Sequence, residues 1–497
     1  MIWQLALRNL GFRKLRTLFL LAGYGLGVAV MIVLLSVGDA MIAQASDEKL
    51  VGGGDVTVLP EGLDVEVMKT GGVGGMFFSI ANARFLYQQL LAAPRLAAQV
   101  RAVAPQIESK LAYVTLPDGR EVPVRAAGEI PDATRAVGAP ALLSSGEWTN
   151  DDGDRRWISP TLAELRHDAD HFHLPPAGIA APESWGEWHY FNVLSADATR
   201  WYFITFLVAG AVPSGAWAGQ LLVTAHEAGR AAKRFSMSVP KSDVRFSTRD
   251  ADLQFGSVGR VLVVPDGSYQ VQGTAIAEDG SGTTLRLDMR VTPGERAYFP
   301  GAALLAGDAP SGYAVLGLRA AAGGSICIAG KCETFTDAQA YHDHNWGAWQ
   351  GVTWDWGAAR AGEFTILYGR VRPAIPESVS DGPLFVYVVD SLGFRAVFRP
   401  KTIAYDDART LAGPGRGPAS VRLYDVRGAD TLDLRLDIED IVATDTRRGL
   451  IERGAGETAR LLTTPWFLQM KGRATLAGRV GGGRITGAGT GFFETYR

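Results

Sequence analysis

The chain is poor in several features on which common protein classes depend. It has two cysteines in 497 residues, too few for a structural zinc site, which normally takes four ligands. Its formal net charge is -3, and no basic patch recurs in the body of the chain, so nothing indicates a nucleic-acid partner. It contains neither a phosphate-binding loop that ends in Lys-Ser/Thr nor a Gly-x-Ser-x-Gly nucleophile elbow. P-loop and α/β-hydrolase chemistry therefore have no supporting motif.

The composition is that of a folded, turn-rich protein. Hydrophobic residues make up 47% of the chain and charged residues 20%, and there are 60 glycines. From about residue 160 onward, short apolar runs alternate with Gly, Asp and Pro turns, as in "GRVLVVPDGSYQVQGTAIAEDGSGTTLRLDMRV" (259–291). The length exceeds one small barrel, so we expect two packed β units, without a sequence repeat.

The N-terminal region has the pattern of a membrane segment. Residues 17–38 carry no charge and are long enough to cross a bilayer core of about 30 Å as a helix. Four basic residues precede them: Arg8, Arg13, Lys14 and Arg16. This pattern predicts a cytoplasmic segment (1–16), a single transmembrane helix (17–38) and an extracytoplasmic or periplasmic body. The alternative is a signal peptide cleaved after Ala45, although the apolar run is longer than a usual signal core.

A second uncharged run, residues 201–225, has the same length but a different pattern. Its interior, "AVPSGAWAG" (211–219), combines Pro, Ser and Gly and indicates a loop. Its first half is rich in aromatic and β-branched residues. We therefore expect two buried strands here and no second membrane helix.

The two cysteines lie close together in "SICIAGKCETF" (325–335). The intervening "AGK" is a turn signal, so Cys327 and Cys332 can face each other across a hairpin. An exported compartment permits a disulfide between them, and we predict this pairing. The alternative is two ordinary strand cysteines.

The first 155 residues resemble a known transporter component. "LALRNLGFRKLRTLFLLAGYGLGVAVMIVLLSVGDAM" (5–41) and the hairpin pattern "KLAYVTLPDGREVPVRAAGEI" (110–130) are similar to the start of a MacB/FtsX-type ABC-transporter permease. The resemblance implies a first membrane helix and the beginning of a periplasmic domain, here 39–155. The three later membrane helices of that family are missing, so this part is a truncated, small α+β segment.

A second resemblance covers about residues 160–497. "APESWGEWHYFNVLSADATRWYFITF" (181–206) and the heptad "YHDHNWG" (341–347) resemble the carotenoid 1,2-hydratase and AttH-like family. That family has two tandem lipocalin-like barrels. The resemblance therefore implies a mainly β protein with a first barrel over 160–360 and a second over 361–497. AttH-like proteins tend to be encoded beside MacB-type permeases, which connects the two resemblances.

The heptad concentrates reactive residues on what we expect to be a strand. Alternation then gives one face two imidazoles beside an indole, and gives the other face a carboxylate and an amide. The first set is His342, His344 and Trp346, and the second is Tyr341, Asp343 and Asn345. In a barrel strand, one of these sets lines the interior.

Hydration of an isolated double bond requires a proton donor, a shielded cation and a positioned water. A buried carboxylic acid, aromatic faces and a histidine can meet these needs. By family resemblance, His344 and Trp346 match the functional pair of the hydratase motif. The family's Tyr-x-Asp pair falls at Tyr368, where Arg370 replaces the acid. Two acids are candidate substitutes: Asp343 and Asp355.

Other interpretations of these residues remain open. The heptad can be purely structural, with its polar groups bonded where two barrels meet. Metal binding by His342, His344 and Asp343 is disfavoured because neighbouring strand residues diverge, so we predict no metal and no cofactor. The second His/Asp-rich stretch, "HDADHFH" (167–173), is interpreted as a polar turn. Candidate ligand-binding residues, which can equally fill the barrel cores, are His342, Trp188, Tyr190, Trp354 and Trp356.

Three functions follow as hypotheses. The first is a membrane-anchored, exported lipocalin-like protein that binds an apolar ligand, a lipid or an isoprenoid, and is linked to a MacB-type transport system. The second is a hydro-lyase of the carotenoid 1,2-hydratase type, which requires an acid in the same cavity as His344 and Trp346. The third is a non-catalytic adaptor that docks ABC-transporter subunits.

Overall fold

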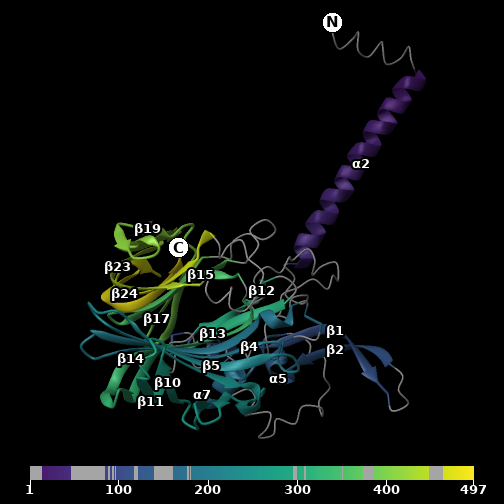
Figure 1. Ribbon diagram of the computed structural model, residues 1–497. Coiled ribbons are helices and arrows are strands. Elements are labelled where there is room, and N and C mark those ends of the chain that lie inside the picture. Colours follow the sequence, from purple (N-terminus) through teal and green to yellow (C-terminus); the bar gives the residue numbers. More distant parts are fainter. Residues whose placement is uncertain are drawn as a thin grey trace. The chain divides into compact units, whose positions relative to one another are not determined.

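The computed structural model describes residues 14–45, most of 84–116, 121–138, 161–175, 178–179, 181–294, 299–306, 309–349, 351–372, 384–446 and 463–497. The chain divides into two compact units (Figure 1). One comprises residues 1–79 and 100–154, and the other comprises residues 80–99 and 155–497. The site described below lies in the second unit.

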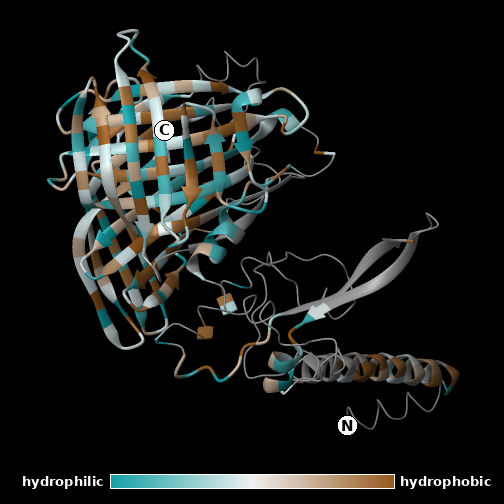
Figure 2. Cartoon of the chain, turned by 90° about the horizontal axis from the view of Figure 1, so that it is seen from below, coloured by the Kyte–Doolittle hydropathy of each residue, from teal (hydrophilic) through white to brown (hydrophobic). Residues whose placement is uncertain are grey.

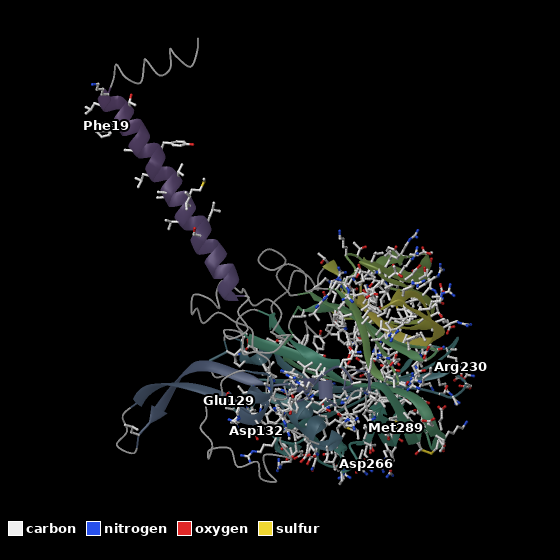
Figure 3. All side chains as sticks on the ribbon, turned by 180° about the vertical axis from the view of Figure 1, so that it is seen from behind. Phe19, Glu129, Asp132, Arg230, Asp266 and Met289 are labelled. Atoms are coloured by element: carbon white, nitrogen blue, oxygen red, sulfur yellow. A yellow bond between two sulfur atoms is a disulfide. The ribbon has the colours of Figure 1, made fainter. Side chains whose placement is uncertain are left out.

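The first unit contains one long helix and a hairpin. Helix α2 (Lys14–Ala45) leaves large apolar side chains exposed, among them Phe19 (Figure 3). Strand β1 (Gln106–Thr115) pairs antiparallel with β2 (Glu121–Glu129), so the hairpin expected over 110–130 is present, and α5 (Pro131–Ala136) follows it. Within the described part of the chain, no helix combines the length and the hydropathy needed to span a membrane.

The second unit begins, after helix α7 (Leu162–Asp170), with a twelve-stranded antiparallel sheet, which we call the first sheet. Its strands are β3 (Trp185–Leu194), β4 (Arg200–Gly210), β5 (Trp217–Glu227), β6 (Lys233–Pro240), β7 (Val244–Phe246), β8 (Asp252–Phe255), β9 (Gly259–Val263), β10 (Tyr269–Ala277), β11 (Thr284–Pro293), β12 (Phe299–Ala306), β13 (Ala309–Ile328) and β14 (Lys331–Ala348). The pairings run β11-β13-β14-β3-β4-β5-β6-β10, and β10 also pairs with β11. These eight strands therefore form a closed ring.

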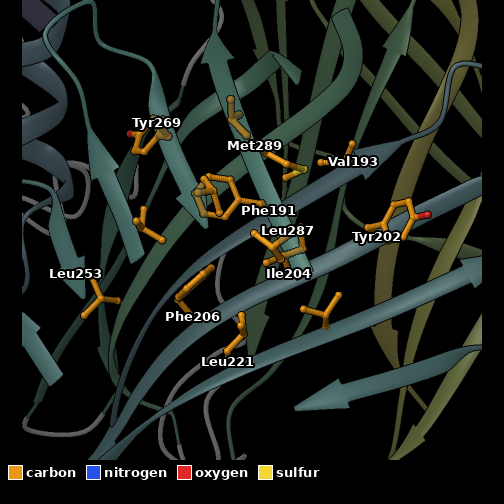
Figure 4. Packing of buried hydrophobic residues seen from close by; sticks show 14 of the residues in the cluster. Phe191, Val193, Tyr202, Ile204, Phe206, Leu221, Leu253, Tyr269, Leu287 and Met289 are labelled. Carbon is orange, nitrogen blue, oxygen red and sulfur yellow. The ribbon is translucent and has the colours of Figure 1, made fainter. Parts of the chain in front are cut away.

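Side chains alternate between the two faces of each strand, and the apolar ones fill the interior of this ring. The uncharged run 201–225 forms strands β4 and β5. This confirms the prediction of two buried strands and no second membrane helix at this place. Apolar and polar residues alternate along the strands (Figure 2). Phe191, Phe206, Leu221 and Leu287 are at most 1% exposed and pack inside (Figure 4). Burying each such side chain contributes about 1.5–3 kcal/mol, so this part of the ring is a packed core.

A second sheet of nine strands follows. Its strands, in their order across the sheet, are β18 (Gly393–Phe398), β17 (Phe385–Asp390), β16 (Phe364–Arg372), β15 (Thr353–Ala361), β25 (Gly483–Tyr496), β24 (Trp466–Val480), β23 (Asp430–Asp445), β22 (Ser420–Arg427) and β19 (Ala404–Asp406). The short strands β20 (Arg409–Leu411) and β21 (Gly415–Gly417) pair separately. The barrel boundary expected between residues 360 and 361 falls at the end of β15.

The two sheets pack against each other through a mostly aromatic layer. Its members come from β3, β4, β13 and β14 of the first sheet and from β15, β16, β17, β23 and β25 of the second, and they include Trp201, Phe203, Tyr341, Phe385 and Phe492. At the far end of β13 and β14, a disulfide joins Cys327 and Cys332 across the hairpin, the pairing expected from the sequence. The prediction of a mainly β protein is confirmed. The tandem lipocalin-like barrels and the periplasmic segment remain predictions.

Candidate functional site

The pairing of β14 with β3 decides which residues of the heptad meet. His344 lies opposite His189, and Trp346 lies opposite Glu187. Opposite residues of an antiparallel pair project to the same face, which here is the interior of the closed ring. His342 shares this face and stacks on Phe191 of the apolar core at 4.2 Å between ring centroids. The predicted alternation of the heptad is therefore confirmed.

Helix α7 and the segment after it bring two further groups to this face. The helix starts with a capping box, in which Thr161 and Glu164 each accept from the other's backbone N–H. It ends at Asp170, and His173 follows three residues later. Our interpretation of 167–173 as a polar turn is therefore wrong, because this stretch supplies an acid and a histidine to the ring interior. Together these residues form what we call the inner cluster: Asp170, His173, Glu187, His189, Tyr269, His342, His344 and Trp346.

Asp170 is the centre of the inner cluster. Its carboxylate lies 3.1 Å from Nε2 of His342 and 2.9 Å from Nδ1 of His344, and it accepts a hydrogen bond from the hydroxyl of Tyr269. Asp170 is 1% exposed and both histidines are fully buried. A single buried carboxylate thus contacts three groups that can carry a proton, two from β14 and one from β10.

Glu187 carries the network toward the surface. Its Oε1 lies 2.8 Å from Nε2 of His344 and 3.1 Å from Nδ1 of His173. The backbone N–H of His173 also donates to both carboxylate oxygens at 2.9 Å. The His173 ring stacks on Trp346 at 3.7 Å between ring centroids, and its side chain is 20% exposed. The two stacked residues are the partly exposed members of the inner cluster, and its other members are buried.

The pKa values of neighbouring groups in the cluster are shifted in opposite directions. Burial alone would raise the pKa of Asp170, but the charge of His342 and the contacts with His342 and His344 hold it well below its usual value. Burial alone would lower the pKa of His344, but the contacts with Asp170 and Glu187 raise it to about 9. Burial and the charge of His344 lower the pKa of His189 well below its usual value. Groups of opposed protonation in contact are typical of acid–base sites.

Several buried polar atoms of the cluster lack a hydrogen-bond partner. They include Nδ1 of His189, Oδ1 of Asp170 and both ring nitrogens of His344, whose carboxylate neighbours are within ion-pair distance but outside hydrogen-bond geometry. Two sets of donor atoms are also spaced closely enough to hold a metal ion, each within 4.8 Å: Asp170 with His189 and His342, and His173 with Glu187 and His344. Neither set contains Asp343, the acid considered from the sequence.

Asp343 lies on the opposite face of β14, between the two sheets. It accepts hydrogen bonds from the hydroxyl of Tyr341 and the amide of Asn345, both at 2.7 Å, and Trp356 donates to the Tyr341 hydroxyl at 2.9 Å. Burial raises the pKa of Asp343 to about 6. The expectation that Asp343 serves the same cavity as His344 is wrong, because successive strand residues point to opposite faces.

Glu494 on β25 belongs to this second, inter-sheet group. It accepts a hydrogen bond from the indole of Trp354 at 2.9 Å. Burial raises the pKa of Glu494 to about 7, and the nearby Asp343 contributes to the rise. The position of Asp343 fits the alternative that polar groups of the heptad are bonded where two β units meet, whereas Glu494 was not anticipated from the sequence.

Tyr368 and Asp355 lie in the second sheet, away from the inner cluster. Tyr368 packs in the apolar core of that sheet, and its hydroxyl has no hydrogen-bond partner. Asp355 pairs with Arg370 at 2.8 Å and accepts from the Tyr405 hydroxyl at 2.7 Å. Burial would raise the pKa of Asp355, but the charge of Arg372 and these bonds lower it. Neither residue reaches His344, so neither supplies its proton donor.

Replacing Tyr368 with Phe is expected to raise the free energy of unfolding by about 1 kcal/mol, because a buried hydroxyl without a partner is desolvated without compensation. Urea unfolding of the full chain, followed by tryptophan fluorescence, measures this. A loss of stability of similar size would contradict the structure, since it would mean that the hydroxyl is bonded.

The aromatic residues expected to pave a cavity pack between the sheets instead. Trp188, Tyr190, Trp354 and Trp356 all belong to, or pack on, the inter-sheet layer. The cleft at this layer has an empty volume of about 390 Å³ including its open mouth, with room inside for about one water molecule. Core filling therefore describes these four residues, and His342 is bonded to Asp170 inside the first sheet.

Comparisons with known proteins give structural likenesses only. No family model matches the chain, and no curated protein matches it. A solved structure from Nitrosomonas europaea, described as an AttH, covers 63% of this chain and 91% of its own at 17% identity, with a TM-score of 0.40. Kievitone hydratase from Nectria haematococca covers 66% and 97% at 14% identity, with a TM-score of 0.41, and CghA with Sch210972 covers 66% and 95% at 12% identity, with a TM-score of 0.42. At these scores, no inference about activity rests on the likenesses.

Sequence reasoning missed most of the inner cluster. Glu187 and His189 stand in the quoted "GEWHYFN" at alternating positions, which was a usable signal for one strand face. Tyr269 carries no local signal. Asp170 and His173 were noticed as a concentration of His and Asp, but their role depends on contacts with β14, more than 160 residues away.

Proposed function

We propose that this protein is an acid–base enzyme of hydro-lyase type that adds water to a carbon–carbon double bond of an apolar substrate at the inner cluster. One observation carries the proposal. Five titratable groups lie in series from the apolar core of the first sheet to the partly exposed His173, each within hydrogen-bond or ion-pair distance of the next: Tyr269, Asp170, His344, Glu187 and His173. Such a chain can move a proton into a site that excludes bulk water.

The reaction balances as the addition of one water. A proton from the cluster bonds to one alkene carbon as the π bond breaks, and a water oxygen bonds to the other carbon. That water gives up a proton, which returns to the cluster. The apolar core beside His342 and the indole of Trp346 suit an apolar substrate and a developing cation. Access requires displacement of the stacked His173 and Trp346.

The requirement set from the sequence is an acid beside His344 and Trp346. Asp170 and Glu187 flank His344 and raise its pKa to about 9, so the protonated imidazole of His344 is itself the acid and the two carboxylates stabilise its charge. This favours the hydro-lyase over simple ligand binding, because binding an apolar ligand needs no buried proton donor. We extend the proposal to two tandem lipocalin-like barrels and to a single-pass anchor at 17–38 with an extracytoplasmic body. A role beside a MacB-type permease is a further expectation.

The test is hydration by the purified full-length chain of linear isoprenoid alkenes in water enriched in oxygen-18. A product heavier by one labelled water is expected with at least one alkene. His344→Ala should lower the rate by at least about 100-fold. His226→Ala is the matched control, since His226 is also buried beside a carboxylate, 3.6 Å from Asp440, but lies outside the inner cluster.

Two results would contradict the proposal. One is the absence of labelled product with every alkene tried, together with mass spectrometry that finds an unchanged lipid retained by the protein. The other is hydration that survives His344→Ala at the rate of the His226→Ala control.

A further inference from the structure

The inner cluster contains a donor set that the proposed reaction does not require. His173, Glu187 and His344 each offer one donor atom, and these three atoms lie within 4.8 Å of one another. Oε1 of Glu187 is 3.1 Å from Nδ1 of His173 and 2.8 Å from Nε2 of His344. With metal–ligand bonds of about 2.0–2.2 Å, neighbouring ligand atoms of a tetrahedral site are separated by about 3.3–3.6 Å, so these donor atoms would have to move apart by a few tenths of an ångström to hold an ion.

We propose that His173, Glu187 and His344 bind one divalent first-row transition metal, with Zn²⁺ the best fit. Two imidazoles and one carboxylate form a three-residue set found in catalytic zinc sites, which keep a further position for water. The partial exposure of His173 leaves a path for the ion. The inference goes beyond the proposed function and does not depend on it.

The surroundings of His344 support this assignment independently. Its second nitrogen, Nδ1, lies 2.9 Å from Asp170, whose other oxygen is bonded to Tyr269 and His342. A carboxylate on the far nitrogen of a metal-binding imidazole fixes the ring and strengthens the ligand. Glu187 is held in the same way, since the backbone N–H of His173 donates to both of its oxygens.

Unpartnered buried atoms are the second observation. Both ring nitrogens of His344 are completely buried, yet neither makes a hydrogen bond of acceptable geometry. Buried polar atoms are rarely left in this state. Two carboxylates flank this ring, 2.9 Å and 2.8 Å from its two nitrogens. A divalent cation between His344 and Glu187 would place a positive charge beside these carboxylates.

The test uses the full-length chain stripped with a chelator and titrated with Zn²⁺ against a chromophoric competitor, with Co²⁺ as a spectroscopic probe of imidazole coordination. One metal ion per chain is expected. Asp170→Asn should weaken binding by about 10- to 100-fold, as losses at such supporting positions do, and His173→Ala should weaken it further. His226→Ala, which removes a buried histidine outside the set, should leave affinity unchanged.

His173→Ala is the decisive variant because the residue follows a helix, is partly exposed and should not prevent folding, whereas Glu187→Gln can. Uptake far below one ion per chain, or affinity in His173→Ala equal to that of the wild type, would overturn the inference. Metal uptake and hydration are measured separately. A protein that takes up no metal in the titration but hydrates an alkene would refute only the metal site.

Discussion

Asp170→Ala is expected to lower the free energy of unfolding by about 3–5 kcal/mol, the usual cost of removing one partner from a buried ionic network. The alanine leaves His342, His344 and the Tyr269 hydroxyl without the carboxylate that all three contact. None of these groups can turn to solvent, because Tyr269, His342 and His344 are completely buried. Denaturant unfolding at neutral pH measures the loss.

The matched control is Asp433→Ala. Asp433 pairs with Arg422 at 2.7 Å, but both side chains are largely exposed, and exposed pairs contribute little. A loss in Asp170→Ala no larger than that of the control would mean that the inner cluster is not the ionic network the structure describes.

Glu494→Gln is expected to remove a pH-dependent loss of stability of about 3 kcal/mol. Burial raises the pKa of Glu494 to about 7 in the folded chain, above its ordinary 4.5. The folded state therefore holds the proton more tightly than the unfolded state. This contribution is fully present below about pH 4.5 and is lost as the pH rises through about 7. Glutamine never ionises, and its amide oxygen can still accept from Trp354.

Free energies of unfolding at pH 5 and pH 8 for both proteins measure this effect. Between pH 5 and pH 8, the free energy of unfolding should fall less in Glu494→Gln than in the wild type. In the control Glu183→Gln, which changes an exposed residue, it should fall as much as in the wild type. Parallel pH profiles of Glu494→Gln and the wild type would show that Glu494 does not ionise within the folded inter-sheet layer.

The sequence predicted those parts of the fold that depend on local periodicity. The loop signal at 211–219 correctly divided an uncharged run into β4 and β5, and the "PDG" turn correctly placed a hairpin over 110–130. The alternation of the heptad correctly separated His344 from Asp343. Each of these depends on residues within one turn or one strand, where period and composition are informative.

The rest of the site could not be read in this way. Asp170 meets His342 across 172 residues of sequence, and its position at the end of α7 becomes meaningful only when the ring has closed. For the same reason, Tyr368 was placed in the site by resemblance, although its strand belongs to the other sheet. The tryptophans were ambiguous because an inter-sheet layer and a ligand cavity select the same residue types.

Strand β14 contributes to both buried groups, with histidines on its inner face and Asp343 on its outer face. A one-residue insertion or deletion between Ala338 and His342, after the bulge that separates Phe335 from Ala338, would exchange the two faces. It would turn His342 and His344 toward the second sheet and Asp343 into the apolar core. Natural variants of this chain should therefore tolerate length changes in the turn itself, but not between Ala338 and His342. The two histidines that β14 contributes to the inner cluster and Asp343 therefore depend on the same alternation in β14, so a length change that displaces one also displaces the other.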